Sequence, residues 1–230
     1  MEVKDCSNLV IRDYTKPSKE IVEGFKVVSA ATAHEAMGRH GYIDSSIRQF
    51  YPGMKVCGTA VTCECKEMDN ITIHAAIHVA GDGDVLVCTM GNYTEQGPFG
   101  DCLATLSMSK GINGLVVDSG CRDGETIREM GFNVFCKGHC MNGTVKEEFG
   151  KVNHPIAFGG QVINPGDIII GDDDGLVVVP KEIAEKVLAD SLARLANEVN
   201  IRNTFLGGTD SWELGGYSEK LRKRGIDLGI

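Results

Sequence analysis

No apolar run in the 230-residue chain is long enough to cross a membrane, because a spanning helix needs about 18 or more consecutive apolar residues. The opening stretch, MEVKDCSNLVIRDY, carries charges throughout and lacks the apolar centre of a secretory signal. Both absences argue against a membrane partner, and we expect the protein in the cytoplasm.

Positive charge is also in short supply. The chain has 23 Lys and Arg against 32 Asp and Glu, which gives a net charge of −9. Nucleic-acid binding requires clustered cations that neutralise phosphates, so this balance argues against a nucleic-acid partner. A small acidic substrate remains compatible with the charge, provided that a local cation or a metal ion binds it.

The cysteines do not form the pattern of a disulfide framework. There are nine, an odd number, and several lie inside strand-like apolar stretches. This pattern predicts reduced, buried thiols. Two close pairs, Cys63 with Cys65 and Cys136 with Cys140, raise the question of structural zinc. Neither has a second pair at zinc-finger spacing, so a reduced core is the favoured interpretation.

Several known signatures of catalytic and metal sites are missing. The chain has no Gly-x-x-x-x-Gly-Lys-Ser/Thr phosphate loop and no arguable Ser-His-Asp set. His74 and His78 are four residues apart on a predicted helix, but without a third ligand such a pair is typical of half-buried packing. The run DDDG at 172–175 lacks the glutamate of a calcium-binding EF-hand loop, and it predicts a hairpin turn.

The middle of the sequence contains a regular alternation of strands and helices. Apolar runs predict the strands, and 3.6-residue periodicity predicts the helices between them. The expected strands are 56–65, 85–90, 115–119 and 133–138, and the expected helices are 70–80, 101–110 and 123–131. Short links between such elements indicate βαβ units on a parallel sheet.

The flanking segments have a different pattern. Helices are expected on both sides of Ser29, and the second has a predicted capping box formed by Thr32 and Glu35. Residues 155–180 predict three short strands joined by tight turns, which is an antiparallel or barrel-like pattern. Residues 181–199 predict a long amphipathic helix.

We therefore expect a mixed α/β fold in three segments. Residues 1–17 form an N-terminal arm, residues 18–200 form a single α/β domain, and residues 201–230 form a polar C-terminal tail. The absence of internal repeats, low-complexity segments and linkers supports one domain.

A glycine-rich loop, GPFG at 97–100, precedes the helix that starts at about Asp101. The first turn of a helix leaves backbone N–H groups without partners, and these groups bind anions such as a substrate carboxylate. The simpler alternative is that Asp101 only caps the helix, which would stabilise it by about 1 kcal/mol.

An arginine and an acid, Arg122 and Asp123, follow the next strand along the chain. Ligands of open parallel sheets bind beyond the carboxyl ends of the strands, so the loops with Asp101 and Arg122 are expected to line one cleft. The guanidinium fork suits the carboxylate and keto oxygens of a 2-oxo acid, and a lone carboxylate with room for water suits Mg²⁺ or Mn²⁺. The alternative is an exposed ion pair that contributes almost nothing.

These residues resemble those of a known family. An Asp, twenty residues and then Arg-Asp, here Asp101 and Arg122-Asp123, is similar to the pattern of the class II aldolases for 4-hydroxy-4-methyl-2-oxoglutarate and 4-carboxy-4-hydroxy-2-oxoadipate. The motifs TAHEAMGR, GTAVT, FGDCLAT, GTVKEEFGKVNHPIAFGG and PGDIIIGDDDG also agree in order and spacing. The regulator of ribonuclease activity A belongs to the same superfamily.

The resemblance implies a fold, an assembly and a reaction. The fold is a swivelling β/β/α domain, an α-β-β-α sandwich, in homotrimers or homohexamers with active sites between subunits. The C-terminal tail would pack on a neighbouring subunit. The reaction is retro-aldol cleavage to pyruvate, with oxaloacetate decarboxylation as a side activity. It requires Mg²⁺ or Mn²⁺ and no Schiff-base lysine.

The resemblance also implies roles for individual residues. The implied substrate-binding residues are Gly100, Asp101, Cys102, Leu103 and Arg122. Asp101 and Arg122 would be catalytic, and Asp123 would hold the metal, mostly through water. A neighbouring subunit would supply a further acid, for which Glu198 lies in the right region and Asn200 is the alternative.

The chain departs from the family pattern at two places. Cys102 replaces the usual leucine, which matters little if only its backbone N–H is used. Thr126 stands where some members carry an acid, and Glu125 lies one residue earlier. The departure at Thr126 and the loose match at Glu198 leave the natural substrate open.

Two hypotheses from different classes follow from the resemblance. The first is a metal-dependent aldolase and oxaloacetate decarboxylase, which the long helix and tail after Pro180 favour. The second is a non-catalytic regulator that binds a ribonuclease or a helicase. A methyltransferase is disfavoured, because no glycine-rich adenosine-binding loop follows a first strand.

Overall fold

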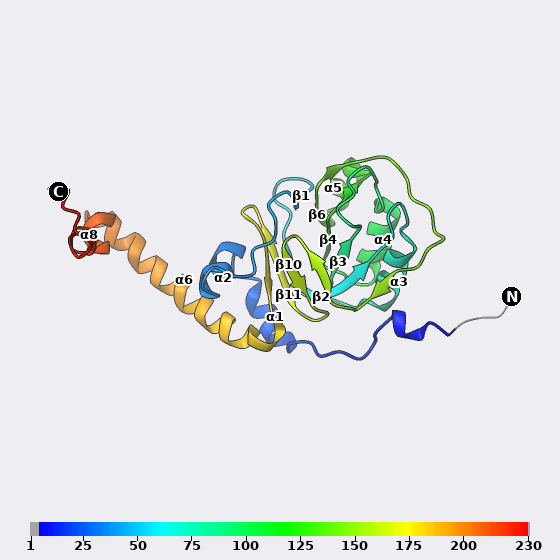
Figure 1. Cartoon of the computed structure of the whole chain (residues 1–230), viewed down its shortest axis with the longest axis horizontal. Coiled ribbons are helices and arrows are strands. Elements are labelled where there is room, and N and C mark those ends of the chain that lie inside the picture. Colours follow the sequence, from blue (N-terminus) through cyan, green and yellow to red (C-terminus); the bar gives the residue numbers. More distant parts are fainter. Residues whose placement is uncertain (1–4, 230) are drawn as a thin grey trace. The chain divides into compact units, whose positions relative to one another are not determined.

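A mixed eight-stranded sheet forms the centre of the protein in the computed structural model, which describes residues 5–229 (Figure 1). The strands, in spatial order, are β1 Arg48–Gln49, β6 Asn133–Cys136, β4 Gly114–Val117, β3 Val85–Thr89, β2 Val56–Glu64, β11 Ile168–Asp172 and β12 Gly175–Val179, with β8 Lys151–Val152 beside β2. The end strands β1 and β12 also contact each other, so the sheet is nearly closed.

The centre of this sheet is parallel, as the alternation of strands and helices predicts. Strands β2, β3, β4 and β6 pair in parallel with one another. All four residues of β4 are buried, as are the first four of β3, because helices and loops cover both faces of such strands. The mixed α/β class and the central βαβ units are therefore confirmed.

The helices follow the predicted order. They are α1 Lys19–Phe25, α2 Ala30–Ala36, α3 Ile71–Val79, α4 Asp101–Ser109, α5 Gly124–Met130, α6 Ala184–Leu206, α7 Ser211–Gly215 and α8 Tyr217–Arg222, with 3₁₀ turns η1 Ser7–Leu9 and η2 Lys181–Ile183. Within the larger unit, α3 packs on β2 and β3, and α2 packs on β11 and β12.

The capping box predicted at the start of α2 is wrong. The N-cap is Ser29, whose Oγ accepts a hydrogen bond from Thr32 N at 3.1 Å. Glu35 lies inside the helix and pairs with Arg39, with 3.0 Å between Oε1 and Nε. Ser29 is itself a preferred capping residue, so the helix begins one turn earlier than the box indicated.

Residues 155–180 form four short strands instead of the three predicted. A hairpin of β9 Ile156–Phe158 and β10 Gln161–Ile163 precedes the β11–β12 hairpin. The run DDDG forms the predicted hairpin turn, in which Asp172 pairs with Gly175. The Asp172 carboxylate also accepts a hydrogen bond from Ala30 N at 2.8 Å. This bond joins the start of α2 to the sheet.

The described part of the N-terminal arm is joined to the sheet by hydrogen bonds and an ion pair. Ile11 N donates to Val152 O at 3.1 Å, and Asn153 Nδ2 donates back to Ile11 O at 2.9 Å. Lys16 forms an ion pair with Asp84, which is only 2% exposed. Residues 1–4 of the predicted arm lie outside the described residues.

The chain divides into two compact units within α6. The larger unit ends at Ser191, and the smaller begins at Leu192. The polar tail expected at 201–230 contains α7 and α8. Among the described residues, no helix is long and apolar enough to cross a membrane.

All nine cysteines are free thiols. Cys63 and Cys65 lie on one face of β2 with their sulfur atoms 3.4 Å apart. Burial raises the pKa of the Cys63 thiol, so this thiol stays protonated and packs as an apolar group.

Candidate functional site

A cleft of about 240 Å³ lies where the loops after the parallel strands meet the start of α3. Its lining residues are Asn70, His74, Gly97, Pro98, Gly100, Asp101, Cys102, Leu103, Arg122, Gly143, Thr144 and Lys146. The cleft therefore brings together Asp101 and Arg122, which the sequence analysis placed at one edge of the sheet. It is smaller than the roughly 300–1,000 Å³ typical of drug-sized ligands, as suits a small metabolite.

One wall of the cleft is the start of α4. Gly100 is the N-cap residue and Asp101 is the first helical residue, so Asp101 is not the cap. Its carboxylate lies over the same turn, where Oδ1 accepts a hydrogen bond from Cys102 N at 2.7 Å. Among the described residues, the backbone N–H groups of Gly100 and Leu103 donate no hydrogen bond. These two donors and the positive end of the helix dipole remain available to an anion.

Arg122 and Asp123 follow β5 Gly120–Cys121, a short strand that comes soon after β4. Arg122 N donates to Phe99 O at 3.1 Å, so the two loops are joined by a backbone hydrogen bond. Arg122 Nε lies 3.3 Å from Asp123 Oδ2, and the same oxygen accepts a 3.3 Å hydrogen bond from Asp101 N. The Asp123 carboxylate therefore contacts both Arg122 and Asp101, the first residue of α4. These are the residues that the sequence predicted to lie together.

The backbone of Asp123 is unusual. Its φ is 55°, in the left-handed region that few residues other than glycine adopt. Asp123 stands at the N-cap of α5, yet its side chain makes no capping hydrogen bond there. The carboxylate turns instead toward Arg122 and Asp101. A residue with a strained backbone whose side chain makes no capping bond to its own helix is typical of a functional position.

Gly100 is required by this close approach. A Cβ atom at position 100 would lie 2.1 Å from Asp123 Oδ2 and 3.1 Å from Arg122 Nε. A side chain at this position would displace the Asp123 carboxylate and press on the Arg122 side chain. The glycine therefore permits the contact between the two loops.

The opposite wall comprises residues that the sequence analysis did not assign to a site. Asn70 and His74 come from the start of α3, and Thr144 and Lys146 come from the loop that follows β7 Gly138–His139. The spacing of His74 and His78 predicted half-buried packing in preference to a metal site. His78 is exposed at the other end of α3 and does not line this cleft. The spacing in sequence gave no signal that residues 70–74 and 144–146 meet.

A buried carboxylate holds this second wall together. Asp69 is 2% exposed, and its oxygens accept three backbone hydrogen bonds, from Ile71, Glu147 and Glu148, at 2.5–2.8 Å. Burial by itself would raise the pKa of Asp69, but these bonds and the charge of Lys146 outweigh it, so the pKa is lowered. The ionised carboxylate thus joins the start of α3 to the segment that carries Lys146.

The carboxylates of Asp101, which lines the cleft, and of Asp123, which lies beside it, suit a hard divalent cation. Asp101 and Asp123 offer oxygen ligands, which Mg²⁺ and Mn²⁺ prefer, and the half-open cleft leaves room for the waters that such ions retain. Within residues 5–229 there is no group of three His, Cys, Asp or Glu side chains that could hold a metal ion. A cation here would therefore depend on these two carboxylates together with water and substrate oxygens.

Glu198, the acid expected to come from a neighbouring subunit, belongs to the smaller unit. It lies on α6 with Oε1 at 3.8 Å from Arg194 Nε and Oε2 at 3.7 Å from Arg202 Nη1. Its role at a neighbouring subunit's site stays a prediction.

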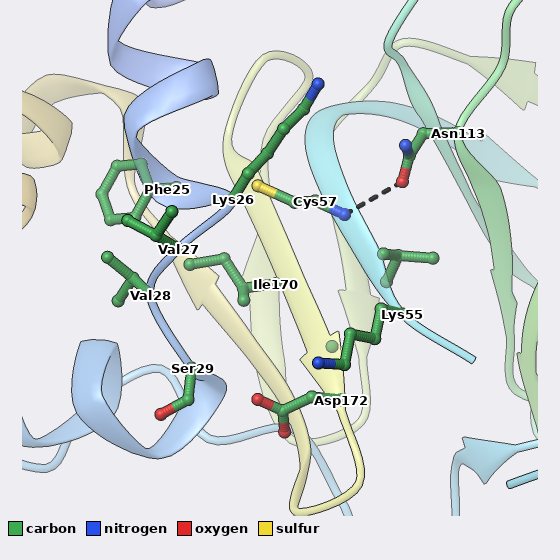
Figure 2. Close-up of a pocket in the computed structure, with 12 residues that line it drawn as sticks. Phe25, Lys26, Val27, Val28, Ser29, Lys55, Cys57, Asn113, Ile170 and Asp172 are labelled. Carbon is green, nitrogen blue, oxygen red and sulfur yellow. Dashed lines mark hydrogen bonds between the residues drawn. The ribbon is translucent and has the colours of Figure 1, made fainter. Parts of the chain in front are cut away.

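A second cavity, of about 280 Å³, lies between the α1–α2 link and strands β2 and β11. Figure 2 shows the hydrogen bond from Cys57 N to Asn113 Oδ1, 3.0 Å long, at its edge. Of its two lysines, Lys26 is paired with Glu23 at 2.7 Å. Burial raises the pKa of the Cys57 thiol to about 11, so it is a poor nucleophile. This cavity contains none of the predicted site residues, so the cleft at α4 is the stronger candidate.

Comparison with known proteins agrees with this assignment of the fold. The sequence profile of the family described as "RraA-like: Aldolase/RraA" matches residues 28–178, which is more than half of the chain. The chain belongs to the RraA-like family. The matched region includes the whole cleft, from Asn70 to Lys146.

Relatives within the RraA-like family carry two kinds of name. A protein of Halalkalibacterium halodurans, "Putative 4-hydroxy-4-methyl-2-oxoglutarate aldolase", is 30% identical over 179 residues, 78% of this chain and 85% of the relative. The crystal structure of Streptomyces coelicolor RraAS2, "an unusual member of the RNase ES inhibitor RraA protein family", is 31% identical, with a TM-score of 0.74 over 82% of this chain and 100% of that chain.

A third relative supports the fold alone. The structure of an uncharacterized protein from Pseudomonas syringae pv. tomato is 24% identical and has a TM-score of 0.78 over 86% of this chain and 93% of that chain. The structural match to this protein thus covers more of the chain than the family profile does.

The steric requirement at position 100 can be tested directly. We expect Gly100→Ala to destabilise the protein by about 1–3 kcal/mol, because the new methyl group displaces the Asp123 carboxylate. Gly143→Ala is the matched control in the same cleft, since its Cβ would lie at an ordinary 3.7 Å from Arg122 Nη1. Urea unfolding measures both changes. Equal stability of the two variants would contradict the close approach of the loops.

The Asp69 hydrogen bonds predict a pH-dependent contribution to stability. We expect Asp69→Asn to lower the free energy of unfolding at pH 7 by about 1–3 kcal/mol, because one oxygen acceptor becomes a donor that faces backbone N–H groups. A lowered pKa in the folded state means that the ionised form stabilises the fold above the unfolded pKa of about 3.9.

The gap between wild type and Asp69→Asn should therefore narrow as the pH falls below about 4, through the folded pKa of Asp69. Denaturant unfolding at several pH values checks this. A gap that stays constant down to pH 2 would show that the charge of Asp69 contributes nothing.

Proposed function

We propose that the protein is a divalent-metal-dependent aldolase. It cleaves 4-hydroxy-4-methyl-2-oxoglutarate or 4-carboxy-4-hydroxy-2-oxoadipate to pyruvate plus pyruvate or oxaloacetate, and it decarboxylates oxaloacetate. The observation that carries the proposal is the direct contact of Arg122, Asp123 and the first turn of α4 around one small cleft. The aldolase names among the family relatives support the same reaction class.

The pyruvoyl end of the substrate binds at the start of α4. The free backbone N–H groups of Gly100 and Leu103 donate hydrogen bonds to its carboxylate at the positive end of the helix. Arg122 donates to the keto oxygen, on which negative charge develops when the bond between carbons 3 and 4 breaks. Because Arg122 also contacts Asp123, its guanidinium is held in place before the substrate arrives.

Asp123 would hold Mg²⁺ or Mn²⁺, and Asp101 would contribute through water. A bound ion would supply Lewis-acid stabilisation of the negative charge that develops on the keto oxygen. The half-exposed side chain of Asp123, whose carboxylate is not used for capping α5, suits this role.

Asp101 moves the proton. One of its oxygens, Oδ1, accepts the bond from Cys102 N and orients the carboxylate. The other oxygen takes the proton of the 4-hydroxyl through water, the bond between carbons 3 and 4 breaks, and its electron pair forms the pyruvate enolate. The same proton then returns to carbon 3, so the reaction consumes no further reagent.

The assembly is a homotrimer or a homohexamer. Leu192, Val199 and Leu206 recur every seven residues on α6 and are between 43% and 86% exposed. Residues at that spacing share one face of a helix. This apolar face suits packing against another copy of the chain, which would also bring Glu198 to a neighbouring site.

The second candidate is a regulator that binds a ribonuclease or a helicase. The relation to Streptomyces coelicolor RraAS2, a member of an RNase ES inhibitor family, favours it. A regulator would need no substrate contact from Arg122, and this difference separates the two proposals.

Replacement of Arg122 tests the aldolase. We expect Arg122→Ala to lower kcat/KM by at least about 100-fold, as the loss of an oxyanion donor does in other enzymes. Pyruvate release from 4-hydroxy-4-methyl-2-oxoglutarate and from oxaloacetate would be followed with coupled lactate dehydrogenase, in Mg²⁺, in Mn²⁺ and in chelator. Chelator should abolish the activity of the wild type.

The matched control is Arg128→Ala on α5. The Arg128 guanidinium lies over the ring of Tyr51 at 5.1 Å and does not line the cleft, so its loss should change kcat/KM by no more than about twofold. A folded wild type that releases no pyruvate from either substrate would contradict the aldolase. Inhibition of a ribonuclease by the same sample would then support the regulator.

A further inference from the structure

Two buried polar atoms beside the cleft have no partner. Asn70 is only 7% exposed, and its Oδ1 accepts no hydrogen bond; Nε2 of the half-buried His74 likewise has none. Both residues line the cleft. An unpaired buried polar group destabilises the fold, so two of them that line the same cleft indicate a place where a ligand supplies the missing bonds.

The orientation of the Asn70 amide is determined by its other end. Nδ2 donates to Pro98 O at 2.7 Å, so the oxygen is the atom left over. This acceptor needs a hydrogen-bond donor such as a hydroxyl group. The bond from Asn70 Nδ2 to Pro98 O also joins the start of α3 to the loop before α4, and it therefore sets the width of the cleft.

His74 lies one helical turn beyond Asn70 on the same face of α3. Burial lowers the pKa of His74, and the positive charge of Lys146 lowers it further. The imidazole is therefore neutral at pH 7, with one nitrogen that donates and one that accepts. Such a ring can bond a hydroxyl group in either direction.

A cation completes this wall. Lys146 is exposed and forms no ion pair within residues 5–229. Asp69 binds the backbone of the next two residues and so holds Lys146 against α3. An ammonium group that lacks a partner at the rim of a cleft attracts a carboxylate.

From this wall we infer a second subsite, which rests on the aldolase proposed above. Asn70 and His74 bind the hydroxyl group on carbon 4 of the substrate, and Lys146 binds an acidic group on the same carbon. The first subsite, at Gly100, Leu103 and Arg122, holds the pyruvoyl end. The enzyme would thus select 2-oxo acids that carry both a hydroxyl and a carboxylate on carbon 4.

The experiment compares two aldols that differ at carbon 4. One is 4-hydroxy-4-methyl-2-oxoglutarate, which has the carboxylate, and the other is 4-hydroxy-2-oxopentanoate, which lacks it. We expect Lys146→Met to lower kcat/KM about 10–100-fold for the first and to leave the second within about threefold. Lys151→Met is the matched control, because Lys151 is likewise exposed and pairs with Glu64 at 3.4 Å outside the cleft.

Asn70→Leu and His74→Leu should lower kcat/KM for both aldols, since both substrates carry the 4-hydroxyl. A third measurement separates binding of the pyruvoyl end of the substrate from binding of the groups on carbon 4. Exchange of the methyl hydrogens of pyruvate into D₂O, followed by NMR, requires only the pyruvoyl subsite. It should therefore be unchanged within about threefold in Lys146→Met and in His74→Leu.

The outcomes distinguish the two proposals. A wild type that neither cleaves an aldol nor exchanges pyruvate hydrogens overturns the aldolase, and the subsite with it. A wild type that does both, with Lys146→Met affecting the two aldols equally or neither, overturns the subsite and leaves the aldolase standing. Melting temperatures within a few degrees of wild type confirm that the variants are folded.

Discussion

A buried carboxylate, Asp118, fixes the positions of the two cleft-forming loops relative to each other. It is 1% exposed and lies just beyond the end of β4. Its two oxygens accept hydrogen bonds from Met90 N and Thr89 Oγ1, both at 2.6 Å, at the end of β3. Because β3 and β4 are parallel and in fixed register, this contact keeps the carboxyl ends of both strands level. The loops that follow then meet, and Arg122 reaches Phe99.

A second buried carboxylate does the same for the opposite wall. Asp69 joins the start of α3 to residues 147–148, while Asp118 joins β3 to the loop that carries Arg122. Neither side chain lines the cleft. The charged groups that do, Arg122, Asp101 and Lys146, are thus held on backbone segments that buried hydrogen bonds make rigid. Preorganisation of this kind is what a site needs to stabilise developing charge without rearranging.

The predictions that succeeded concern features that are local or periodic. The strands of the parallel sheet and helices α3 to α5 were predicted to within about one or two residues, because apolar runs and helical periodicity report burial directly. The antiparallel region was undercounted by one strand, because the three-residue strands of the β9–β10 hairpin are too short to show a period. The start of α2 was misplaced, because Ser29 and Thr32 are both good caps and only the fold decides between them.

The sequence predicted the residues of one wall of the site and not those of the other. Asp101, Arg122 and Asp123 follow consecutive parallel strands, so topology alone brings them together. Asn70, His74 and Lys146 carry no such signal, because residues 70–74 and 146 meet through tertiary contacts, among them the Asp69 hydrogen bonds and the bond from Asn70 N to Val145 O. A pair of histidines at helical spacing directed attention to His78, whereas the structure pairs His74 with Asn70 and Lys146.

By itself, then, the sequence determined the mixed α/β class, the parallel centre of the sheet and the meeting of an acid, an arginine and a helix start at one edge. These features follow from burial patterns and chain order, which short segments encode. Only the tertiary structure decided that the Asp123 carboxylate makes no capping bond to α5, that Gly100 permits the contact, and that Asn70 and His74 each bring a buried polar atom without a partner to the cleft. Those features depend on distances between segments far apart in the chain, and no local pattern specifies such distances.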